Sequence, residues 1–419
     1  MAFVQSFRTA VNAYNSVSLI IRIVIGIIAG TILAFVTPGA TWIGIFGEVF
    51  VGALKAVAPF LVFVLVTSAL CQGGGALDRR FGTVIFFYLA TTIIASATAV
   101  LASTIFPQTL ALNVTAAHGA APSGIAEVMH SLLRDMIANP LTLLINGKYI
   151  GILFWAVVFG FALKCTASDV TKTMLLNVSD AASQAVRWII NCAPFGIMGL
   201  VFDSVSSYGV EIFTTYGKLV VLLVGCMLFV ALVINPLFVA LTLRRNPYPL
   251  VWRCLRESGV TAFFTRSSAA NIPVNMALCE KLGLDREMYS VSIPLGATIN
   301  MNGAAVTIAV MTLACVHTLG LPVSLPTALV LSVLSALAAC GASGVAGGSL
   351  LLIPMSCSLF GISNDVAMQV VGVGFIIGVI QDSVETALNS SADALFTATA
   401  EFYQWKKEGR ALPASVFGG

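Results

Sequence analysis

Long apolar runs, separated by short polar segments, make up most of the chain. A helix of roughly 20 apolar residues crosses the hydrocarbon core of a bilayer, which is about 30 Å thick. Runs of this length and character predict membrane-spanning helices at 17–37, 43–70, 83–106, 149–166, 181–202, 217–243, 286–318 and 364–400. The pattern therefore predicts an all-α polytopic membrane protein with eight transmembrane helices.

Two segments in the second half of the chain interrupt the apolar pattern with small polar residues. The segment at about 255–279 contains TRSSAANIP (265–273), and the segment at about 325–360 contains CGASGVAGGS (340–349). Backbone that leaves the helix at membrane depth is tolerated only where protein or a water-filled cavity surrounds it. Helix ends exposed at such a place attract ions, because their N–H groups favour anions and their carbonyls favour cations. We predict that each segment is a re-entrant helical hairpin whose tip lies in such a place.

The distribution of Lys and Arg favours the two hairpins. Basic residues follow the second, fourth and sixth runs, the first hairpin and the last run: Arg79, Arg80, Lys164, Lys172, Arg244, Arg245, Arg253, Arg256, Lys281, Arg286, Lys406, Lys407 and Arg410. These residues all lie on one side of the membrane only if each polar segment returns to the side from which it entered. Loops rich in Lys and Arg face the cytoplasm. We therefore expect a bacterial inner-membrane protein with both termini in the cytoplasm and no cleaved signal peptide.

Composition supports the membrane class and excludes others. The chain is 58% hydrophobic and only 9% charged, whereas soluble domains are about 25% charged. The formal net charge of +3 is too small for nucleic-acid binding, which needs a concentrated basic face. The nine cysteines and three histidines are dispersed without the spacing of metal ligands, which disfavours a metal enzyme.

The last predicted helix carries acidic residues, which are rare in membrane spans. An acid at the centre of a transmembrane helix costs about 3 kcal/mol on insertion scales, and such acids usually have a function. Polar residues spaced by four, three and four positions share one face of this helix: Asp382, Thr386, Asn389 and Asp393. Glu385 lies beside that face, and Arg266 in the first hairpin is a candidate partner charge.

The two polar segments have matching sequels. GATINMNGAA (296–305) follows the first and QDSVETALNSSAD (381–393) follows the second, so each half holds a hairpin and then a helix with Asn. Paired interrupted segments in two halves point to inverted repeats and to a transporter's binding site near the membrane midplane. Thr298, Asn300 and Asn302 add oxygen atoms there, and hard cations take oxygen ligands, including backbone carbonyls.

At these motifs the chain resembles the dicarboxylate/amino acid–cation symporters, the family that includes the glutamate transporters. TRSSAANIP, GATINMNGAA, CGASGVAGG and DSVETALNSSAD match in the right order, and the resemblance covers most of the chain. Within the family the likeness is greatest to the bacterial sodium-coupled serine/threonine branch. The resemblance implies the glutamate-transporter fold, a homotrimer in membrane lipid, sodium as the coupling ion and no cofactor.

The resemblance also implies a division into a fixed scaffold and a moving transport part. Residues 1–82, with helices 1 and 2, and 107–215, with helices 4 and 5, would form the scaffold. Helix 3 at 83–106 and residues 216–419 would form the transport part. This last segment would contain helix 6, hairpin 1 at about 255–279, helix 7 at about 286–318, hairpin 2 at about 325–360, helix 8 at about 364–400 and a cytoplasmic tail.

By the family's pattern, the substrate site lies between the hairpin tips and helix 8. Asp382 would hold the substrate's ammonium group, and Ser268 and Asn389 would hold its α-carboxylate. Backbone around Arg266 and Val345, at the two tips, would complete the pocket. The substrate residues implied are Arg266, Ser267, Ser268, Val345, Asp382, Glu385, Thr386 and Asn389.

The resemblance implies sodium sites beside the substrate. One would use the Asp393 carboxylate with backbone carbonyls of Gly296, Asn300 and Asn389, and a second would use carbonyls of Thr298, Ala339, Cys340 and Ala342. A third family site matches Tyr88, Thr91, Thr92, Asn300 and Asn302. Asn302 replaces an aspartate of the acidic-substrate relatives. Without that charge we expect one or two sodium ions per cycle instead of three.

Two substitutions favour a small neutral substrate. Transporters of acidic amino acids carry an arginine where this chain has Glu385 and a threonine where it has Ala304. A carboxylate side chain would then meet a like charge in a desolvated pocket, which costs several kcal/mol and discriminates against aspartate and glutamate. L-Serine and L-threonine as substrates come from the resemblance.

Other mechanisms remain as alternatives. Proton-coupled symport is one, because carboxylates serve both ions, and a cation channel lined by the acids is another. An intramembrane enzyme with Ser267 or Ser268 as nucleophile is disfavoured, since no His or Lys base is evident near either serine. We expect no enzyme activity. In the symport hypothesis, sodium at Asp393 orders the site, hairpin 2 closes as the outer gate and the transport part moves.

Overall fold

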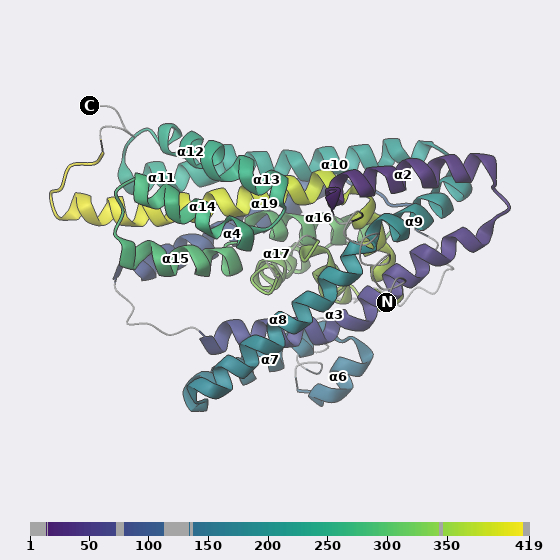
Figure 1. Ribbon diagram of the computed structural model, residues 1–419, viewed down its shortest axis with the longest axis horizontal. Helices are drawn as coiled ribbons and strands as arrows, with labels where there is room; N and C mark the ends of the chain where they lie inside the picture. The colour runs from purple at the N-terminus through teal and green to yellow at the C-terminus, as the bar shows by residue number, and fades with distance from the viewer. Residues whose placement is uncertain are drawn as a thin grey trace, which may run out of the picture.

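The protein is described by a computed structural model that covers residues 14, 16–72, 79–112, 134, 137–342 and 347–413. Within these residues all regular secondary structure is helical, and there is no strand (Figure 1). The long helix at the C-terminal end, α19 (Asn364–Lys407), runs along the long axis of the molecule (Figure 1). An all-α architecture is thus observed in the described part, as the apolar runs predict.

The first half of the chain contains helices that agree with most of the predicted spans. They are α2 (Leu19–Val36), η1 (Thr41–Ile43), α3 (Gly44–Gln72), α4 (Arg79–Ile105), α6 (Pro140–Asn146), α7 (Tyr149–Thr166), α8 (Asp169–Asn191) and α9 (Ala193–Tyr208). Polar side chains mark several starts, because a hydroxyl or amide oxygen accepts the unpaired N–H groups of a first turn. Ser18 caps α2, Asn139 caps α6 and Ser168 caps α8.

The second half follows the same pattern with more interruptions. Its elements are α10 (Glu211–Phe229), η2 (Val230–Ile234), α11 (Asn235–Leu243), α12 (Tyr248–Cys254), η3 (Leu255–Gly259), α13 (Val260–Thr265), α14 (Ser268–Lys281), α15 (Arg286–Ile299), α16 (Asn302–Thr318), α17 (Leu325–Ala339), η4 (Ser349–Leu352), α18 (Ile353–Ser358) and α19. α10, η2 and α11 continue one another and correspond to the sixth predicted span.

Length and composition allow five of the described helical segments to cross a membrane: Thr41–Gln72, Arg80–Ile105, Glu211–Leu243, Arg286–Thr318 and Asn364–Lys407. A sixth is possible if α8 and α9, which meet at a bend of 53°, form one span. α2 and α7 contain shorter apolar helices. The structure therefore supports a multi-pass membrane protein, and it does not by itself reproduce the predicted count of eight.

The predicted span at 181–202 is wrong as a single helix. The chain breaks at Cys192, and Pro194 stands in the first turn of α9. Proline is tolerated there because the N–H it lacks would have no helical partner, but it cannot continue a preceding helix. The apolar run therefore covers the end of α8 and the first part of α9.

Helix packing divides the described chain into two groups. α2 packs along α9, and α3 packs against α7, α8 and α9. α4 instead packs on α16 and α17, and α19 is surrounded by α10, α13, α14, α15, α16 and α18. The two groups meet where α18 and α19 contact α3, α7 and α9.

The first polar segment forms two helical arms joined by a short turn. α13 ends at Thr265, Arg266 takes the left-handed conformation (φ 51°, ψ 33°), and α14 starts at Ser268. Ser267 caps α14 by accepting a hydrogen bond from the Ala270 N–H. We call residues 255–281 hairpin 1, and its turn lies against α19 because α13 and α14 both contact that helix.

The second polar segment also consists of two helical arms. α17 ends at Ala339, and the returning arm comprises η4 and α18. We call residues 325–358 hairpin 2; of its tip, 340–342 and 347–348 lie within the described residues. Both arms contact α16, and α18 also contacts α19.

The predicted helix at 286–318 is in fact two helices. α15 ends at Ile299 and α16 starts at Asn302, so that Asn300 and Met301 leave the helical conformation. Residues 302–316 of α16 are all buried, as expected of a helix enclosed by others on every side. The break interrupts the helical backbone at 299–301 in the buried middle of the protein, beside the polar face of α19.

Candidate functional site

The polar face of α19 is buried at the centre of the second helix group. Asp382, Glu385 and Asp393 are 2%, 5% and 1% exposed, and Thr386 and Asn389 are also buried. The helix break at 299–301 and the tips of both hairpins form hydrogen bonds with this face. Asp382, on the predicted polar face of this helix, thus contacts partners that lie 35 and 116 positions away in the sequence.

Arg266 and Asp382 form a buried ion pair. Arg266 Nε donates to Asp382 Oδ2 over 2.7 Å, and the two side chains are 8% and 3% exposed. The left-handed backbone of Arg266 is rare for a residue other than glycine, and such conformations are often found at functional sites. Gly347, at the tip of hairpin 2, donates its N–H to Asp382 Oδ1 over 3.3 Å. Asp382 is therefore contacted from both hairpins.

Glu385 lies one helical turn after Asp382 and has partners on two other helices. Thr307 of α16 donates to Glu385 Oε2 over 2.7 Å, and Ser349 of hairpin 2 donates to the same oxygen over 2.9 Å. The Gln381 amide nitrogen also donates to Oε2. The start of α16 approaches so closely that a Cβ atom at Gly303 would lie 2.8 Å from Glu385 Cα, so glycine is required there.

Asn389 links α19 to the helix break. Its Oδ1 accepts the Gly303 N–H over 2.7 Å, and its Nδ2 lies 3.4 Å from the Met301 sulfur. Ser268 is buried at the start of α14. Thr386 donates its hydroxyl to the Asp382 carbonyl, one turn back on the same helix. Val345, which the sequence placed at the tip of hairpin 2, lies outside the described residues.

The first predicted sodium site has the chemistry of a cation site. Asp393 Oδ1 accepts a hydrogen bond from Asn300 Nδ2 over 2.8 Å, whereas Asp393 Oδ2 and Asn300 Oδ1 are buried without a partner. No Lys, Arg or His in the described part of the chain pairs with Asp393. A buried carboxylate without a compensating charge is strongly unfavourable, so the oxygens fit a bound cation.

Gly296 and Tyr88 frame this carboxylate. A Cβ atom at position 296 would lie 2.6 Å from Asp393 Oδ1 and 2.8 Å from the Tyr88 hydroxyl oxygen. The Tyr88 hydroxyl lies 3.2 Å from the carbonyls of Ser292 and Asp393. Only a glycine lets the backbone of α15 approach the carboxylate in this way.

Residues predicted for the second site lie where the tip of hairpin 2 meets the end of α15. The Cys340 thiol lies 3.4 Å from the Ile299 carbonyl, next to Thr298. The Ala339 carbonyl accepts the Ala342 N–H over 2.9 Å, so this carbonyl has a partner within the tip. The thiol contact therefore brings Cys340, at the tip of hairpin 2, to the end of α15.

The third predicted set also comes together. Thr92 and Thr91 donate their hydroxyls to Asn302 Oδ1 over 2.7 and 3.3 Å. Asn302 Nδ2 is buried without a partner. The amide thus takes part in a hydrogen-bonded cluster with the threonines of α4. Tyr88 lies one turn before these threonines and faces Asp393.

Residues that the sequence did not single out complete the site. Thr307, Ser349 and Gln381 contact Glu385. Gln381 was detectable, since it precedes Glu385 by four positions and so lies on the same helix face. The partners on α16 and hairpin 2 carry no such signal. A second cluster joins hairpin 1 to α19, where the amides of Asn271 and Asn275 donate to Ser390 Oγ over 2.7 and 3.1 Å.

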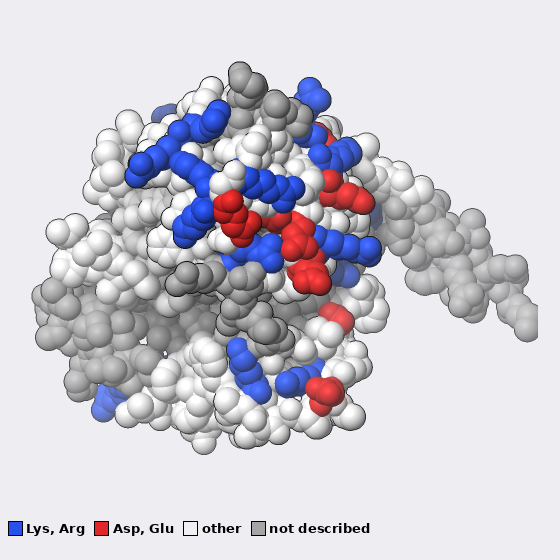
Figure 2. Space-filling view, turned by 90° about the vertical axis from the view of Figure 1, so that its left-hand side faces the viewer, with Lys and Arg blue, Asp and Glu red and all other residues white. Residues whose placement is uncertain are grey.

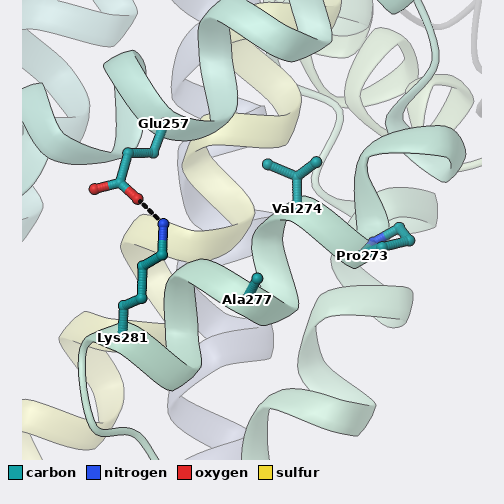
Figure 3. Close-up of a pocket in the computed structure, with 5 residues that line it drawn as sticks. All are labelled: Glu257, Pro273, Val274, Ala277 and Lys281. Carbon is teal, nitrogen blue, oxygen red and sulfur yellow. Dashed lines mark hydrogen bonds and ion pairs between the residues drawn. The ribbon is translucent and has the colours of Figure 1, made fainter.

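A surface hollow of about 410 Å³ lies elsewhere, between η3 and α14. Figure 3 shows Glu257 and Lys281 pointing toward one another across it, 3.0 Å apart, beside Pro273, Val274 and Ala277. None of the predicted site residues lines it. Its two charges neutralise one another and its other walls are apolar, so the buried cluster around α19 is the stronger candidate.

The candidate site does not have the composition of a transition-metal centre. Across the described ranges, no three His, Cys, Asp or Glu side chains gather to hold a metal ion. The oxygens that do gather are carboxylates, amides, hydroxyls and carbonyls, which suit hard cations.

Comparisons with known proteins give a consistent result. The profile of the sodium:dicarboxylate symporter family matches residues 16–401. A protein named serine/threonine transporter SstT from Bifidobacterium adolescentis is 63% identical over 413 residues, which cover 99% of this chain and 96% of the relative. Proteins of the same name from Streptococcus thermophilus and Streptococcus agalactiae are each 58% identical, over 95% and 93% of this chain and 99% and 97% of their own lengths.

Proposed function

Because the chain belongs to the sodium:dicarboxylate symporter family, we propose that it imports L-serine and L-threonine together with sodium ions by alternating access. The family expected from the four polar motifs is confirmed. The chain is a multi-pass membrane transporter and not an enzyme. The substrates are proposed from the names of relatives that match nearly the whole chain.

The single observation that carries the proposal is the state of Asp393. Its Oδ2 is buried without a partner, and so is Oδ1 of Asn300, the residue whose amide donates to Asp393 Oδ1. In a membrane protein such a charge is tolerated when it serves an ion pathway. We assign the first sodium ion to Asp393 with carbonyls of Gly296, Asn300 and Asn389, and a second to carbonyls of Thr298, Ala339, Cys340 and Ala342.

The amino acid is proposed to bind between the hairpin tips and α19. Asp382 receives the substrate's ammonium group in exchange for part of its pairing with Arg266. Ser268 and Asn389 receive the α-carboxylate, with backbone of both tips, including Val345, around it. The hydrogen bond from Gly303 to Asn389 ties this substrate contact to the helix break where sodium binds, so each ligand raises the affinity for the other.

Glu385 is proposed to keep the site specific for neutral side chains. It is buried three residues after Asp382 and has no basic partner among the described residues. A substrate carboxylate would therefore meet an uncompensated like charge, and Ala304 offers it no hydroxyl. This supports exclusion of aspartate and glutamate.

The division into two packing groups supports a moving transport part. α2, α3, α7, α8 and α9 pack on one another, whereas α4, α10, α11 and the helices from α12 to α19 surround the candidate site. We propose that the first group is the scaffold and the second the transport part, with hairpin 2 as the outer gate. This proposal keeps the division into segments that the resemblance implies.

The relative positions of the two groups support an inward-facing arrangement. Lys55, eleven residues into α3, pairs with Asp365 in the first turn of α19. At 1.5 Å per residue, the start of α19 therefore lies level with a point about 16 Å along α3 from the first residue of that helix. At the opposite end α19 extends beyond the end of α3 (Figure 1). We propose that the transport part here lies displaced toward the side of the C-terminus.

The end of the molecule that carries the C-terminus is proposed to face the cytoplasm. Figure 2 shows Lys and Arg side chains gathered on that end. Lys281 and Arg253 contribute through their pairs with Glu257, and Lys406 through its hydrogen bond to the Leu243 carbonyl. Such an excess of Lys and Arg marks cytoplasmic loops. We therefore propose that the protein lies in the bacterial inner membrane with both termini in the cytoplasm.

A homotrimer is proposed from the family resemblance. Large apolar side chains are exposed on α7 and α8, including Phe161, Val170 and Trp188, so this part of the scaffold group offers surface to lipid or to other copies. Native mass spectrometry in detergent tests the stoichiometry. A mass of three chains supports the proposal, and a monomer at all detergent concentrations contradicts it.

Uptake of radiolabelled L-serine into proteoliposomes tests the function directly. An inward sodium gradient is compared with an inward proton gradient, and unlabelled L-threonine serves as competitor. Saturable uptake driven by sodium and inhibited by threonine supports the proposal. Uptake driven by protons alone would assign the carboxylates to proton transfer, and flux that does not saturate with substrate would indicate a channel.

A further inference from the structure

Three hydrogen-bond donors converge on a single oxygen of Glu385. Thr307 Oγ1 and Ser349 Oγ lie 2.7 and 2.9 Å from Oε2, and the Gln381 amide donates to it as well. Gln381 Nε2 also lies 2.7 Å from Thr307 Oγ1. We call Thr307, Ser349 and Gln381 the clamp of Glu385.

The protons of the clamp can be assigned completely. Gln381 Nε2 has two hydrogens, of which one goes to Glu385 and the other to the Thr307 oxygen. The Thr307 hydroxyl accepts that bond, so its own hydrogen is directed to Glu385 Oε2. Ser349 supplies the third hydrogen. Because an oxygen that accepts three hydrogen bonds cannot itself carry a proton, Oε2 is the fixed, unprotonated end of the carboxylate.

The other carboxylate oxygen has no such partner. No donor from the described residues reaches Glu385 Oε1. The clamp fixes the carboxylate plane through Oε2 and leaves Oε1 as a pre-oriented acceptor. Hydrogen-bonded surroundings that fix a side chain in this way are what a selective binding site requires.

The position of Glu385 fits the hydroxyl of the proposed substrates. Asp382, which is proposed to hold the ammonium group, precedes Glu385 by three residues, about 4.5 Å along the helix axis and on nearly the same face. Serine and threonine carry an ammonium group and a β-hydroxyl only three bonds apart. A ligand bound to Asp382 through its ammonium can therefore direct its hydroxyl toward Glu385.

We propose that the clamp of Thr307, Ser349 and Gln381 holds Glu385 so that Oε1 accepts a hydrogen bond from the β-hydroxyl of the substrate. The inference rests on the proposed function and names how its site distinguishes serine and threonine from alanine. Ser349 belongs to hairpin 2, which also contacts Asp382 through Gly347. Recognition of the hydroxyl thus depends on the position of hairpin 2, and the clamp residues are positioning residues.

The consequence is discrimination against amino acids that lack the hydroxyl. A site built to bond a hydroxyl loses that hydrogen bond when the hydroxyl is missing, and this weakens binding. We expect L-serine to be preferred over L-alanine by roughly tenfold to hundredfold in the unmodified protein. A loosened Glu385 can no longer be held in the pose that the hydroxyl needs, so the preference falls.

The test compares L-serine and L-alanine in sodium-driven proteoliposome uptake. Thr307→Val, Ser349→Ala and Gln381→Met each remove one donor of the clamp. Thr312→Val on the same helix and Ser356→Ala on the same hairpin are the controls, since both are buried and neither contacts Glu385. The readouts are KM for each amino acid, the maximal rate and the sodium dependence.

We expect the clamp variants to raise KM for serine by roughly tenfold, with KM for alanine and the sodium dependence unchanged, and Thr307→Ser to restore the serine preference. Equal loss of serine and alanine affinity, or an unchanged serine-to-alanine ratio in all three variants, would overturn the clamp while sodium-driven serine uptake by the unmodified protein still stands. Absence of that uptake would overturn the proposed function and the clamp together.

Discussion

Arg266 Nε lies 2.7 Å from Asp382 Oδ2, and this ion pair joins the turn of hairpin 1 to the middle of α19. Removal of one partner of a buried pair leaves the other charge uncompensated, and this destabilises a protein by about 3–5 kcal/mol. The same carboxylate is the proposed partner of the substrate's ammonium group. The pair is therefore expected to affect both stability and binding.

Asp382→Asn should abolish high-affinity serine uptake. The substitution keeps the side-chain volume but removes the charge, so we expect KM for serine to rise at least a hundredfold and the melting temperature to fall. Uptake kinetics and a thermal unfolding scan measure the two effects. Ser383→Ala is a matched control, because Ser383 is the next residue and bonds only to its own helix. Near-normal KM in Asp382→Asn would remove Asp382 from the substrate site.

Asp393→Asn should remove the effect of sodium on the protein. A ligand present at one hundred times its Kd stabilises the folded state by about 2.7 kcal/mol, so sodium is expected to raise the melting temperature of the unmodified protein over that in potassium. The variant should show neither this rise nor sodium-driven uptake. Ser391→Ala, two residues earlier on α19 and bonded to the Ala387 carbonyl, should keep both. A sodium-dependent shift that persists in Asp393→Asn contradicts the first sodium site.

Local patterns in the sequence predict the helices and the polar face well, because both depend on residues close together in the chain. Apolar length alone predicts α3, α4 and α7 nearly to their observed ends. The spacing of Asp382 and Asp393 on one face follows from helical periodicity, and charge suggests the pairing with Arg266. The break at Cys192 was missed although Pro194 signalled it, since apolar runs conceal a bend.

Contacts that connect distant segments could not be obtained in the same way. Ser349 and Thr307 reach Glu385 from 36 and 78 positions away, and nothing in a single sequence pairs one buried hydroxyl with one acid. The interruption at Asn300 was equally concealed, because Asn and Gly are compatible with an apolar run. Tertiary packing decides which of these polar groups meet, and packing is not local.

Glu385→Gln should relax the exclusion of acidic amino acids. The amide keeps the size of the side chain but removes the like charge that a substrate carboxylate would meet, so we expect L-aspartate to inhibit serine uptake at roughly tenfold lower concentration than in the unmodified protein. Competition curves with L-aspartate and L-threonine measure this. Asp365→Asn, an acid at the exposed start of α19, should leave aspartate inhibition unchanged. Equal aspartate inhibition in Glu385→Gln and the unmodified protein would refute the charge argument.

A cross-link between Lys55 and Asp365 should lock the transporter. These residues pair between α3 and the start of α19, and the proposed movement of the transport part must separate them. In a background without the exposed Cys165 and Cys192, Lys55→Cys combined with Asp365→Cys is expected to form a disulfide on oxidation and to reduce uptake by more than tenfold, with recovery under reductant. Each single variant should transport normally, since an exposed ion pair contributes less than about 1 kcal/mol. Glu48 lies seven residues before Lys55, about two turns or 10 Å nearer the start of α3. Glu48→Cys with Asp365→Cys should therefore cross-link only in an outward-facing state. Full activity of the oxidised Lys55→Cys/Asp365→Cys protein would rule out the proposed movement.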